Sequence, residues 1–238
     1  MSSLPLVSHG SGPEALAEAV DNGHVVILVD ILRASSTIVT ALAHGAEKII
    51  PVPTVEEARE RIYYYPNGFL AGERAAYPPA GFDFGNSPRS FRTDRIQGRP
   101  LILTTSNFTR TLGTPPDDAT ILVGAFLNID HVALIARQLA YEMEQPISVI
   151  SAGSMQGVAA EDDFGSYHIM SRIQFPDDPP SYADTSDIAR ELLVSRHGSL
   201  LVQAGYEADI YFCAQPNRYH LTPILRDSAF VPFTPYND

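Results

Sequence analysis

Short apolar runs alternate with amphipathic segments along this chain. Val25 to Val29 is a continuous run of apolar, mainly β-branched residues, which is typical of a strand buried on both faces of a sheet. A helical pattern through Ile38 and Ala43 follows it, and Gly45 is suited to end that helix. Lys48 to Val52 predicts a second strand. This alternation favours an α/β fold.

The same patterns continue to the end of the chain. Thr54 and Glu57 form a capping box, which predicts a helix that runs to about Tyr65. Further strands are predicted at 69–71, 101–103, 121–123, 147–150 and 222–225, helices at 131–143, 161–175 and 186–203, and loops at 75–90 and 176–182. We expect a layered α/β/α architecture with a largely parallel or mixed central sheet. We favour one domain over residues 1–238, with a division into two lobes near residue 117 as the alternative.

The charge balance limits the class of partner. The formal net charge is −12, which argues against nucleic acid or an anionic membrane as the main partner. An anionic substrate would need arginines, helix N-termini or a bound cation to reverse the local field. Cys213 is the single cysteine, so no intramolecular disulfide forms. Since no apolar stretch approaches the roughly 20 residues that span a bilayer and no signal peptide is visible, we expect a cytoplasmic protein.

Polar residues collect where the predicted strands end. Asp30 and Arg33 follow one strand, and Glu73 and Arg74 follow another. The segments 104–107 and 154–161 follow two more. In open α/β sheets, ligands bind beyond the carboxyl ends of the strands. Each residue alone is explained at least as well as a helix cap or loop residue, but their occurrence together predicts a binding site.

Asp30 and Arg33 have two interpretations. A carboxylate held directly after a buried strand can bind a hard cation, and Arg33 can clamp an anionic oxygen with two hydrogen bonds. The amides of Ser35, Ser36 and Thr37 would then begin a helix and bind an anion. Alternatively, Asp30 and Arg33 form a local ion pair. The residues alone leave both open.

Two later segments also have two interpretations each. Asn86 and Ser87 precede Pro88, so they face a substrate, begin a helix, or do both. Glu161 and Asp162 open another predicted helix, where acidic residues complement the helix dipole. Three adjacent carboxylates at 161–163 exceed what capping requires, so a metal ligand there is the second interpretation.

Familiar catalytic motifs are absent. The spacing of Cys213 and Arg218 is too short for a cysteine phosphatase loop, so Cys213 is interpreted as a buried small hydrophobe. Leu32 stands where an aspartyl-phosphate phosphatase carries its second aspartate. His197 is interpreted as a loop or surface residue, and His168 is a weak candidate for proton transfer.

Several segments, taken in order, resemble the 2-phosphosulfolactate phosphatase family. They are Val29 to Thr37 with Gly45-Ala46, Gly72 to Arg74 with Gly81 to Pro88, Thr104 to Arg110, Gly124 to Asn128, and Ala152-Gly153 with Glu161-Asp162. Each segment is weak alone, but their order over about residues 25–226 is a specific family signal.

The resemblance implies a magnesium-dependent phosphatase. The family's named reaction converts 2-phospho-3-sulfolactate to 3-sulfolactate and phosphate, a step towards coenzyme M. Phosphoryl transfer needs charge neutralisation and alignment, which Mg²⁺ and arginines supply. We assign Asp30, Arg33 and Glu73 to catalysis, and Asp30, Glu73, Glu161 and Asp162 to Mg²⁺. The assigned substrate contacts are Ser35, Ser36, Arg74, Asn86, Ser87, Thr104, Thr105, Asn107 and Arg110. Whether Asp30 binds metal, attacks phosphorus or accepts a proton stays open.

Two residues depart from the family pattern. Phe108 stands where relatives commonly carry glycine, and a side chain there is expected to reshape the pocket if the turn approaches the substrate. Ser151 stands where relatives often carry cysteine, so a cysteine nucleophile is not expected. Both changes bear on substrate choice more than on fold.

Two other functions are alternatives to 2-phosphosulfolactate hydrolysis. The chain hydrolyses another small anionic phosphate ester, or it is a non-catalytic domain that binds an anionic metabolite.

The aromatic residues Tyr63 to Tyr65 pack within the chain or against a second subunit of a homo-oligomer, and we favour packing within the chain.

Overall fold

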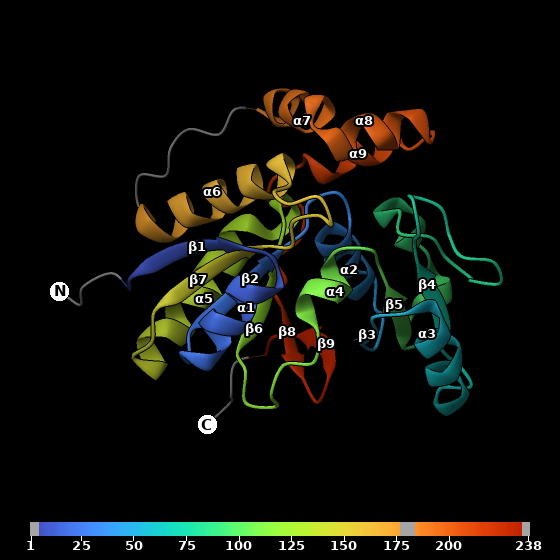
Figure 1. The fold of residues 1–238 in the computed structure, drawn as a ribbon, viewed down its shortest axis with the longest axis horizontal. Helices are drawn as coiled ribbons and strands as arrows, with labels where there is room; N and C mark the ends of the chain where they lie inside the picture. The colour runs from blue at the N-terminus through green and yellow to red at the C-terminus, as the bar shows by residue number, and fades with distance from the viewer. Residues whose placement is uncertain (1–4, 177–183, 235–238) are drawn as a thin grey trace.

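The strands of this protein form one mixed sheet (Figure 1). The computed structural model describes residues 5–176 and 184–234. Within these residues the sheet has nine strands, in the order β1-β7-β2-β6-β8-β9-β3-β5-β4. They are β1 (Val7–Ser11), β2 (Val25–Val29), β3 (Ile49–Pro51), β4 (Phe69–Gly72), β5 (Leu101–Thr104), β6 (Ile121–Gly124), β7 (Ile147–Ser151), β8 (Pro223–Arg226) and β9 (Ala229–Pro232).

An antiparallel hairpin joins two parallel groups of strands. Strands β1, β7, β2 and β6 run parallel to one another, and so do β3, β5 and β4. The β8–β9 hairpin lies between the groups and pairs antiparallel with β6 on one side and β3 on the other. Each junction has one register pair, Leu122 with Ile224 and Ile49 with Phe230. The predicted mixed sheet is confirmed.

Helices cover the sheet on both faces. They are α1 (Gly12–Asp21), α2 (Ala34–Ala43), α3 (Val55–Arg61), α4 (Phe108–Leu112), α5 (Ile129–Met143), α6 (Ala160–Gln174), α7 (Thr185–Val194), α8 (Arg196–Gln203) and α9 (Glu207–Cys213). Helices α5 and α6 pack together against β2 and β7, and α1 packs against the same strands from the other side. Helices α7, α8 and α9 pack on one another at the top of Figure 1. This arrangement confirms the predicted α/β/α layers.

Most predicted elements form, with one clear error. The run Val25–Val29 is β2 and has no exposed surface. Thr54 caps α3 by accepting a hydrogen bond from the Glu57 amide, as predicted. The predicted helix 186–203 is wrong as one element, because α7 ends before Ser195 and α8 begins after it. Ser195 has extended backbone and its side chain caps the Gly198 amide, which starts a new helix.

Several elements escaped prediction. The strand β1 lies at the sheet edge and exposes Ser8 and His9, so it lacks the apolar run of a buried strand. Helices α4 and α9 are short, at five and seven residues, which is less than the window that reveals helical periodicity. The loop predicted at 176–182 lies almost wholly outside the described residues.

The surface corrects one further expectation. The predicted packing within the chain is confirmed for Tyr65, which packs against the core, and wrong for Tyr63 and Tyr64, which are 83% and 80% exposed. Within the described parts of the chain, no helix is both long and apolar enough to cross a membrane. The domain count, one unit or two lobes divided near residue 117, stays a prediction.

Candidate functional site

A pocket of about 680 Å³ lies where strand ends from both parallel groups meet α8. Asp30 follows β2, Glu73 follows β4, and Ser106 and Asn107 follow β5. His197 comes from α8 on the other side of the pocket. The sequence predicted polar residues at these strand ends, and four of its candidate site residues besides Asp30, namely Arg33, Glu73, Asn86 and Asn107, also line the pocket.

Asp30 is held rigidly at the end of β2. Its Oδ1 accepts a hydrogen bond from the Ala34 amide at 3.1 Å, and its own amide donates to Ser35 Oγ at 2.9 Å. Only 5% of Asp30 is exposed. Burial, reinforced by the charges of Glu73 and Glu161, raises its pKa from 3.8 to about 6. A carboxylate in this position is destabilised when ionised, and a nearby cation would relieve that cost.

Glu73 is fixed by backbone amides. Its Oε1 accepts from the Ser106 amide at 2.8 Å, and its Oε2 accepts from the Ala76 amide at 3.2 Å. Ala76 belongs to a tight turn in which Ala75 and Ala76 have φ of 51° and 74°, a strained conformation for alanine. Gly72, just before Glu73, lets β4 approach β5 closely, since a Cβ at this position would lie 2.0 Å from the Thr104 carbonyl oxygen.

Arg33 pairs with a residue that the sequence did not suggest. Its Nη1 donates to Asp209 Oδ2 at 2.7 Å, and its Nη2 donates to the Ala76 carbonyl at 3.0 Å. The guanidinium also lies 4.3 Å from the centre of the Tyr206 ring. Both side chains of the ion pair are 2% exposed. The alternative of a local Asp30–Arg33 ion pair is therefore wrong, because α9 supplies the carboxylate.

Asn86 and Ser87 follow the long loop and lie beside this ion pair. Ser87 Oγ donates to the other oxygen of Asp209 at 2.8 Å. Asn86 is 3% exposed and lines the pocket, and its Oδ1 is buried with no hydrogen-bond partner among the described residues. Pro88 begins a short 3₁₀ helix (Pro88–Phe91), as the sequence predicted.

Glu161 pairs with His197. Their hydrogen bond joins Glu161 Oε1 to His197 Nδ1, which leaves Nε2 as the second ring nitrogen of a residue that lines the pocket. This hydrogen bond raises the pKa of His197 above 6.5 despite its partial burial. Burial alone would raise the pKa of Glu161, but the hydrogen bond and charge of His197 hold it below its ordinary value. The opposite shifts describe one ion pair. The interpretation of His197 as a loop or surface residue is wrong.

Asp162 lies behind the Asp30 segment rather than in the pocket wall. Its Oδ1 accepts from the Ile31 amide at 2.9 Å. Burial, with the charges of Asp30 and Glu161, raises its pKa well above 3.8. Helix α6 can come this close because Gly165 has no side chain, and a Cβ there would lie 2.5 Å from Ile31. Asp162 therefore supports the Asp30 loop from behind.

Seven of the nine predicted substrate contacts do not line the pocket: Ser35, Ser36, Arg74, Ser87, Thr104, Thr105 and Arg110. The hydroxyls of Ser35 and Ser36 donate to the carbonyls of Leu28 and Ile31. The expected anion nest at α2 is filled by the chain itself, since the amides of Ser35 and Thr37 donate to backbone carbonyls. The guanidinium of Arg74 bonds to Thr104 Oγ1 and to the carbonyl oxygens of Glu73 and Pro53.

The remaining hydroxyl and histidine candidates are also occupied elsewhere. Thr105, which precedes α4, exchanges hydrogen bonds with Thr109 in the first turn of that helix. His168 packs edge-on against Phe164 and Tyr167, and burial lowers its pKa. It lies outside the pocket wall.

Phe108 and Ser151 do not shape this pocket. Phe108 has no exposed surface and packs against Phe230, with ring centres 5.8 Å apart. The expectation that its side chain reshapes the pocket is therefore wrong, because the ring points into the core. Ser151 is also fully buried, and its Oγ lies 3.0 Å from both Ser166 Oγ and His9 Nε2.

The carboxylates suit Mg²⁺ better than a metal that requires a full protein cage. Within residues 5–176 and 184–234, no three His, Cys, Asp or Glu side chains cluster as a ready metal site. Mg²⁺ usually takes one or two carboxylates, keeps several waters and binds substrate phosphate. Asp30 and Glu73 meet that requirement in the pocket wall, whereas Glu161 is already paired with His197.

Comparisons with known proteins identify the family of this chain. The profile of the 2-phosphosulpholactate phosphatase family matches residues 12–228. The chain belongs to this family. A probable 2-phosphosulfolactate phosphatase of Symbiobacterium thermophilum is 32% identical over 223 residues, which cover 88% of this chain and 94% of that protein. One from Pseudothermotoga lettingae is 32% identical over 234 residues, covering 92% and 97%. One from Clostridium acetobutylicum is 30% identical over 225 residues, covering 90% and 94%.

Family membership confirms the recognised resemblance and the enzyme class, that of a phosphoric monoester hydrolase. The residues that sequence reasoning missed in this family member are His197 and Asp209. Both lie in the helices after residue 184, beyond the segments that carried the resemblance. The signal that could have found them is an unmatched charge, because buried Arg33 and Glu161 each require a partner.

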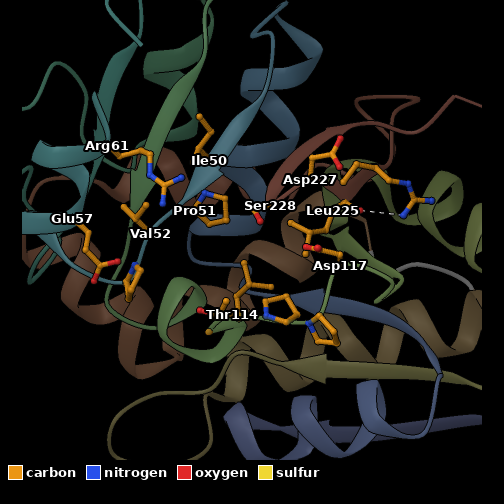
Figure 2. A pocket seen from close by; sticks show the side chains of 16 residues that line it. Ile50, Pro51, Val52, Glu57, Arg61, Thr114, Asp117, Leu225, Asp227 and Ser228 are labelled. Carbon is orange, nitrogen blue, oxygen red and sulfur yellow. Dashed lines mark hydrogen bonds between the residues drawn. The ribbon is translucent and has the colours of Figure 1, made fainter. Parts of the chain in front are cut away.

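A second pocket, of about 150 Å³, lies beside the β8–β9 turn (Figure 2). It is lined by side chains from β3 and α3, by the loop before β6, and by Asp227 and Ser228 of the turn. None of the residues predicted for the site lines it, so the pocket at the strand ends is the candidate active site.

Proposed function

We propose that this chain hydrolyses 2-phospho-3-sulfolactate to 3-sulfolactate and phosphate and that it requires Mg²⁺. The observation that carries the proposal is the meeting of Asp30, Glu73, Arg33 and His197 in one pocket. Two carboxylates, a buried guanidinium and an imidazole are the groups that phosphoryl transfer to water requires. The family membership supports the choice of substrate.

Asp30 and Glu73 are the residues that would hold Mg²⁺. Their oxygens come from the ends of β2 and β4 and are fixed by amides, so little conformational freedom is lost on binding. When bound, Mg²⁺ neutralises phosphate charge and orients the ester. The burial and mutual repulsion that raise the pKa of Asp30 support a cation here, because a positive charge would stabilise the ionised carboxylates.

Arg33 and Asn86 are the proposed contacts of the substrate anions. Arg33 keeps its charge in every relevant state, and its pairing with Asp209 holds the guanidinium at the pocket wall. Asn86 sits beside it with a buried amide group. Asn107 lines the pocket at the start of α4 and offers a further polar contact.

His197 is the proposed donor of the proton that the leaving oxygen requires. The leaving group is an alkoxide of sulfolactate, which needs a proton as the P–O bond breaks. Glu161 keeps His197 protonated above the ordinary range of imidazole. His197 Nε2, the ring nitrogen not bonded to Glu161, is the atom that would donate.

Two alternative functions would use the same pocket. A phosphatase for another small anionic ester would use the same residues on a different substrate. A non-catalytic anion-binding domain is disfavoured, because clustered carboxylates in a chain of net charge −12 weaken anion binding unless a cation is bound.

The test is phosphate release from 2-phospho-3-sulfolactate, with EDTA treatment and Mg²⁺ restoration. We expect turnover that EDTA abolishes and Mg²⁺ restores. Turnover only of other esters would support the first alternative, and none on a broad ester panel would support the second. Turnover unaffected by EDTA would contradict the metal assignment while leaving the phosphatase intact.

A 2-phosphosulfolactate phosphatase would act in coenzyme M biosynthesis, in the cytoplasm. We propose no nucleic-acid or membrane partner, in accord with the net charge of −12. A homo-oligomer that covers the exposed Tyr63 and Tyr64 is proposed and is tested by light scattering.

A further inference from the structure

The active-site pocket has an apolar side that the chemistry of phosphate transfer does not use. Helix α8 presents Leu200, Leu201 and the cap residue Ala204 to the same pocket as His197. These positions follow the spacing of one helix face. Tyr77 and Met155 also line the pocket, beside the polar residues Gln156, Arg196 and Gln203. The helix therefore carries a proton donor at one end of this face and an apolar surface at the other.

Part of this apolar surface is exposed to solvent. Tyr77 is 55% exposed, Met155 76% and Leu200 47%. Large apolar side chains gathered at the mouth of a functional pocket commonly contact a ligand. Met155 and Tyr77 come from loops after β7 and β4, so three separate parts of the chain contribute to the surface.

The volume and the apolar lining of the pocket exceed what the proposed substrate needs. A volume of about 680 Å³ lies within the roughly 300–1,000 Å³ typical of sites for drug-sized ligands. The proposed substrate has a three-carbon skeleton whose substituents are all anionic. Carboxylate and sulfonate groups gain nothing from Leu200, Leu201 and Met155, because an apolar wall cannot offer them hydrogen bonds.

We infer that the pocket contains a second subsite, built by one face of α8 with Tyr77 and Met155, that binds the apolar group of a larger phosphate monoester. This inference rests on the proposed phosphatase function. It assigns to the same site a further activity on alkyl phosphates. Water supplies the oxygen of the new P–O bond, the bond between phosphorus and the alkoxide oxygen breaks, and a proton converts that alkoxide to the alcohol.

The experiment compares methyl, propyl and hexyl phosphate with 2-phospho-3-sulfolactate in buffer that contains Mg²⁺. Each methylene that leaves water is expected to raise kcat/KM about two- to fourfold while the subsite fills. The organic group is the only variable in the alkyl series, so the gradient reports burial of that group and not phosphate chemistry.

Two variants on α8 locate the subsite. Leu200→Gln replaces an apolar pocket residue and is expected to flatten the chain-length gradient. Val202→Gln is the matched control, because Val202 is 40% exposed on the same helix and is not part of the pocket wall. The control is expected to keep the gradient. Both positions are substantially exposed, so neither substitution is expected to prevent folding.

Each outcome decides between the inference and the function on which it rests. A flat alkyl series with good turnover of phosphosulfolactate would overturn the subsite alone. An alkyl gradient without turnover of phosphosulfolactate would overturn the proposed substrate alone. Turnover of neither would overturn both. A gradient that survives in Leu200→Gln would overturn the assignment of the subsite to α8.

Discussion

The two walls of the pocket differ in origin and in role. The strand-end wall consists of Asp30, Glu73, Asn86, Ser106 and Asn107, which follow strands or the loop beside them. The helical wall is the pocket face of α8, with Asp209 of α9 behind it. The two carboxylates of the strand-end wall, Asp30 and Glu73, are fixed by backbone amides. Groups of the helical side act by pairing, since His197 binds Glu161 and Asp209 binds Arg33.

This difference shows how an acidic chain can build a site for an anion. Strand ends bring carboxylates together, and the pKa of Asp30 is raised mainly by its burial and further by the charges of Glu73 and Glu161. The helices then hold one cation, Arg33, and add a second, His197. Removing a strand-end group should therefore abolish the reaction, whereas removing a helical partner should alter the charge or position of a group that stays. Substitutions on each wall separate these two effects.

Asp30→Asn has the largest expected effect on activity. The amide keeps the shape and the hydrogen bond from Ala34 but cannot hold a cation. Loss of an electrostatic contributor of this kind typically costs about 10³-fold in kcat. Steady-state phosphate release measures it. A variant that retains more than a tenth of wild-type kcat would contradict the role of Asp30.

The same substitution should stabilise the fold at high pH when no metal is present. Because the folded-state pKa of Asp30 is raised from 3.8 to about 6, its contribution to stability is fully present below pH 3.8 and is lost as pH rises through 6. At pH 8 the cost amounts to about 3 kcal/mol at most. Thermal unfolding in EDTA should show a higher Tm for Asp30→Asn, and added Mg²⁺ should stabilise only the wild type. An unchanged Tm would indicate that the buried charge is compensated.

The strand-end wall was largely predictable from the sequence, and the helical wall was not. Asp30 directly follows five apolar residues that form β2 with no exposed surface, so its place at a sheet edge follows from pattern alone. The pairing of Glu161 with His197 spans 36 positions, and that of Arg33 with Asp209 spans 176. Periodicity describes one element at a time and carries no information about which elements meet.

The fold shows the same division. Strands buried on both faces are recognised in the sequence as apolar runs. The edge strand β1 and the short helix α9 carry no such clear pattern. Ser195 divides α7 from α8 through a local cap that competes with helix continuation. That break directly precedes the turn of α8 that carries His197.

Asp209→Asn tests the helical side and should have the second-largest effect. It leaves Arg33 charged and buried without its carboxylate, which typically destabilises a protein by about 3–5 kcal/mol. A displaced guanidinium is expected to lower kcat/KM by about 10²-fold. Denaturant unfolding and steady-state kinetics measure the two effects.

A double variant separates position from stability. Arg33→Met with Asp209→Leu replaces the whole ion pair by apolar groups and should recover most of the lost stability. It should stay inactive, because Arg33 itself is the proposed substrate contact. Recovery of activity together with stability would show that the pair is structural only.

Glu161→Gln should shift a pH profile rather than abolish turnover. Glu161 raises the pKa of His197, and a protonated donor loses activity as pH rises through its pKa. Without the carboxylate the pKa of His197 falls, so the alkaline loss of kcat should begin at a lower pH. Above that pKa, kcat should fall about tenfold for each further unit of pH. His197→Asn is the matched control and should lack that limb. An unchanged limb in Glu161→Gln would assign it to another group.

Arg74→Gln should have the smallest effect, although the sequence assigned Arg74 to the substrate. Its guanidinium bonds to Thr104 and to the backbone of Glu73 and Pro53, and it lies outside the pocket wall. Loss of these hydrogen bonds should cost about 1 kcal/mol of stability, with kcat/KM reduced less than about fivefold, since Glu73 keeps its bonds from the Ser106 and Ala76 amides. Arg33→Gln, measured beside it, should lose far more. Equal losses would mean that Arg74 turns into the pocket when substrate binds, and the strand-end wall would then supply its own cation.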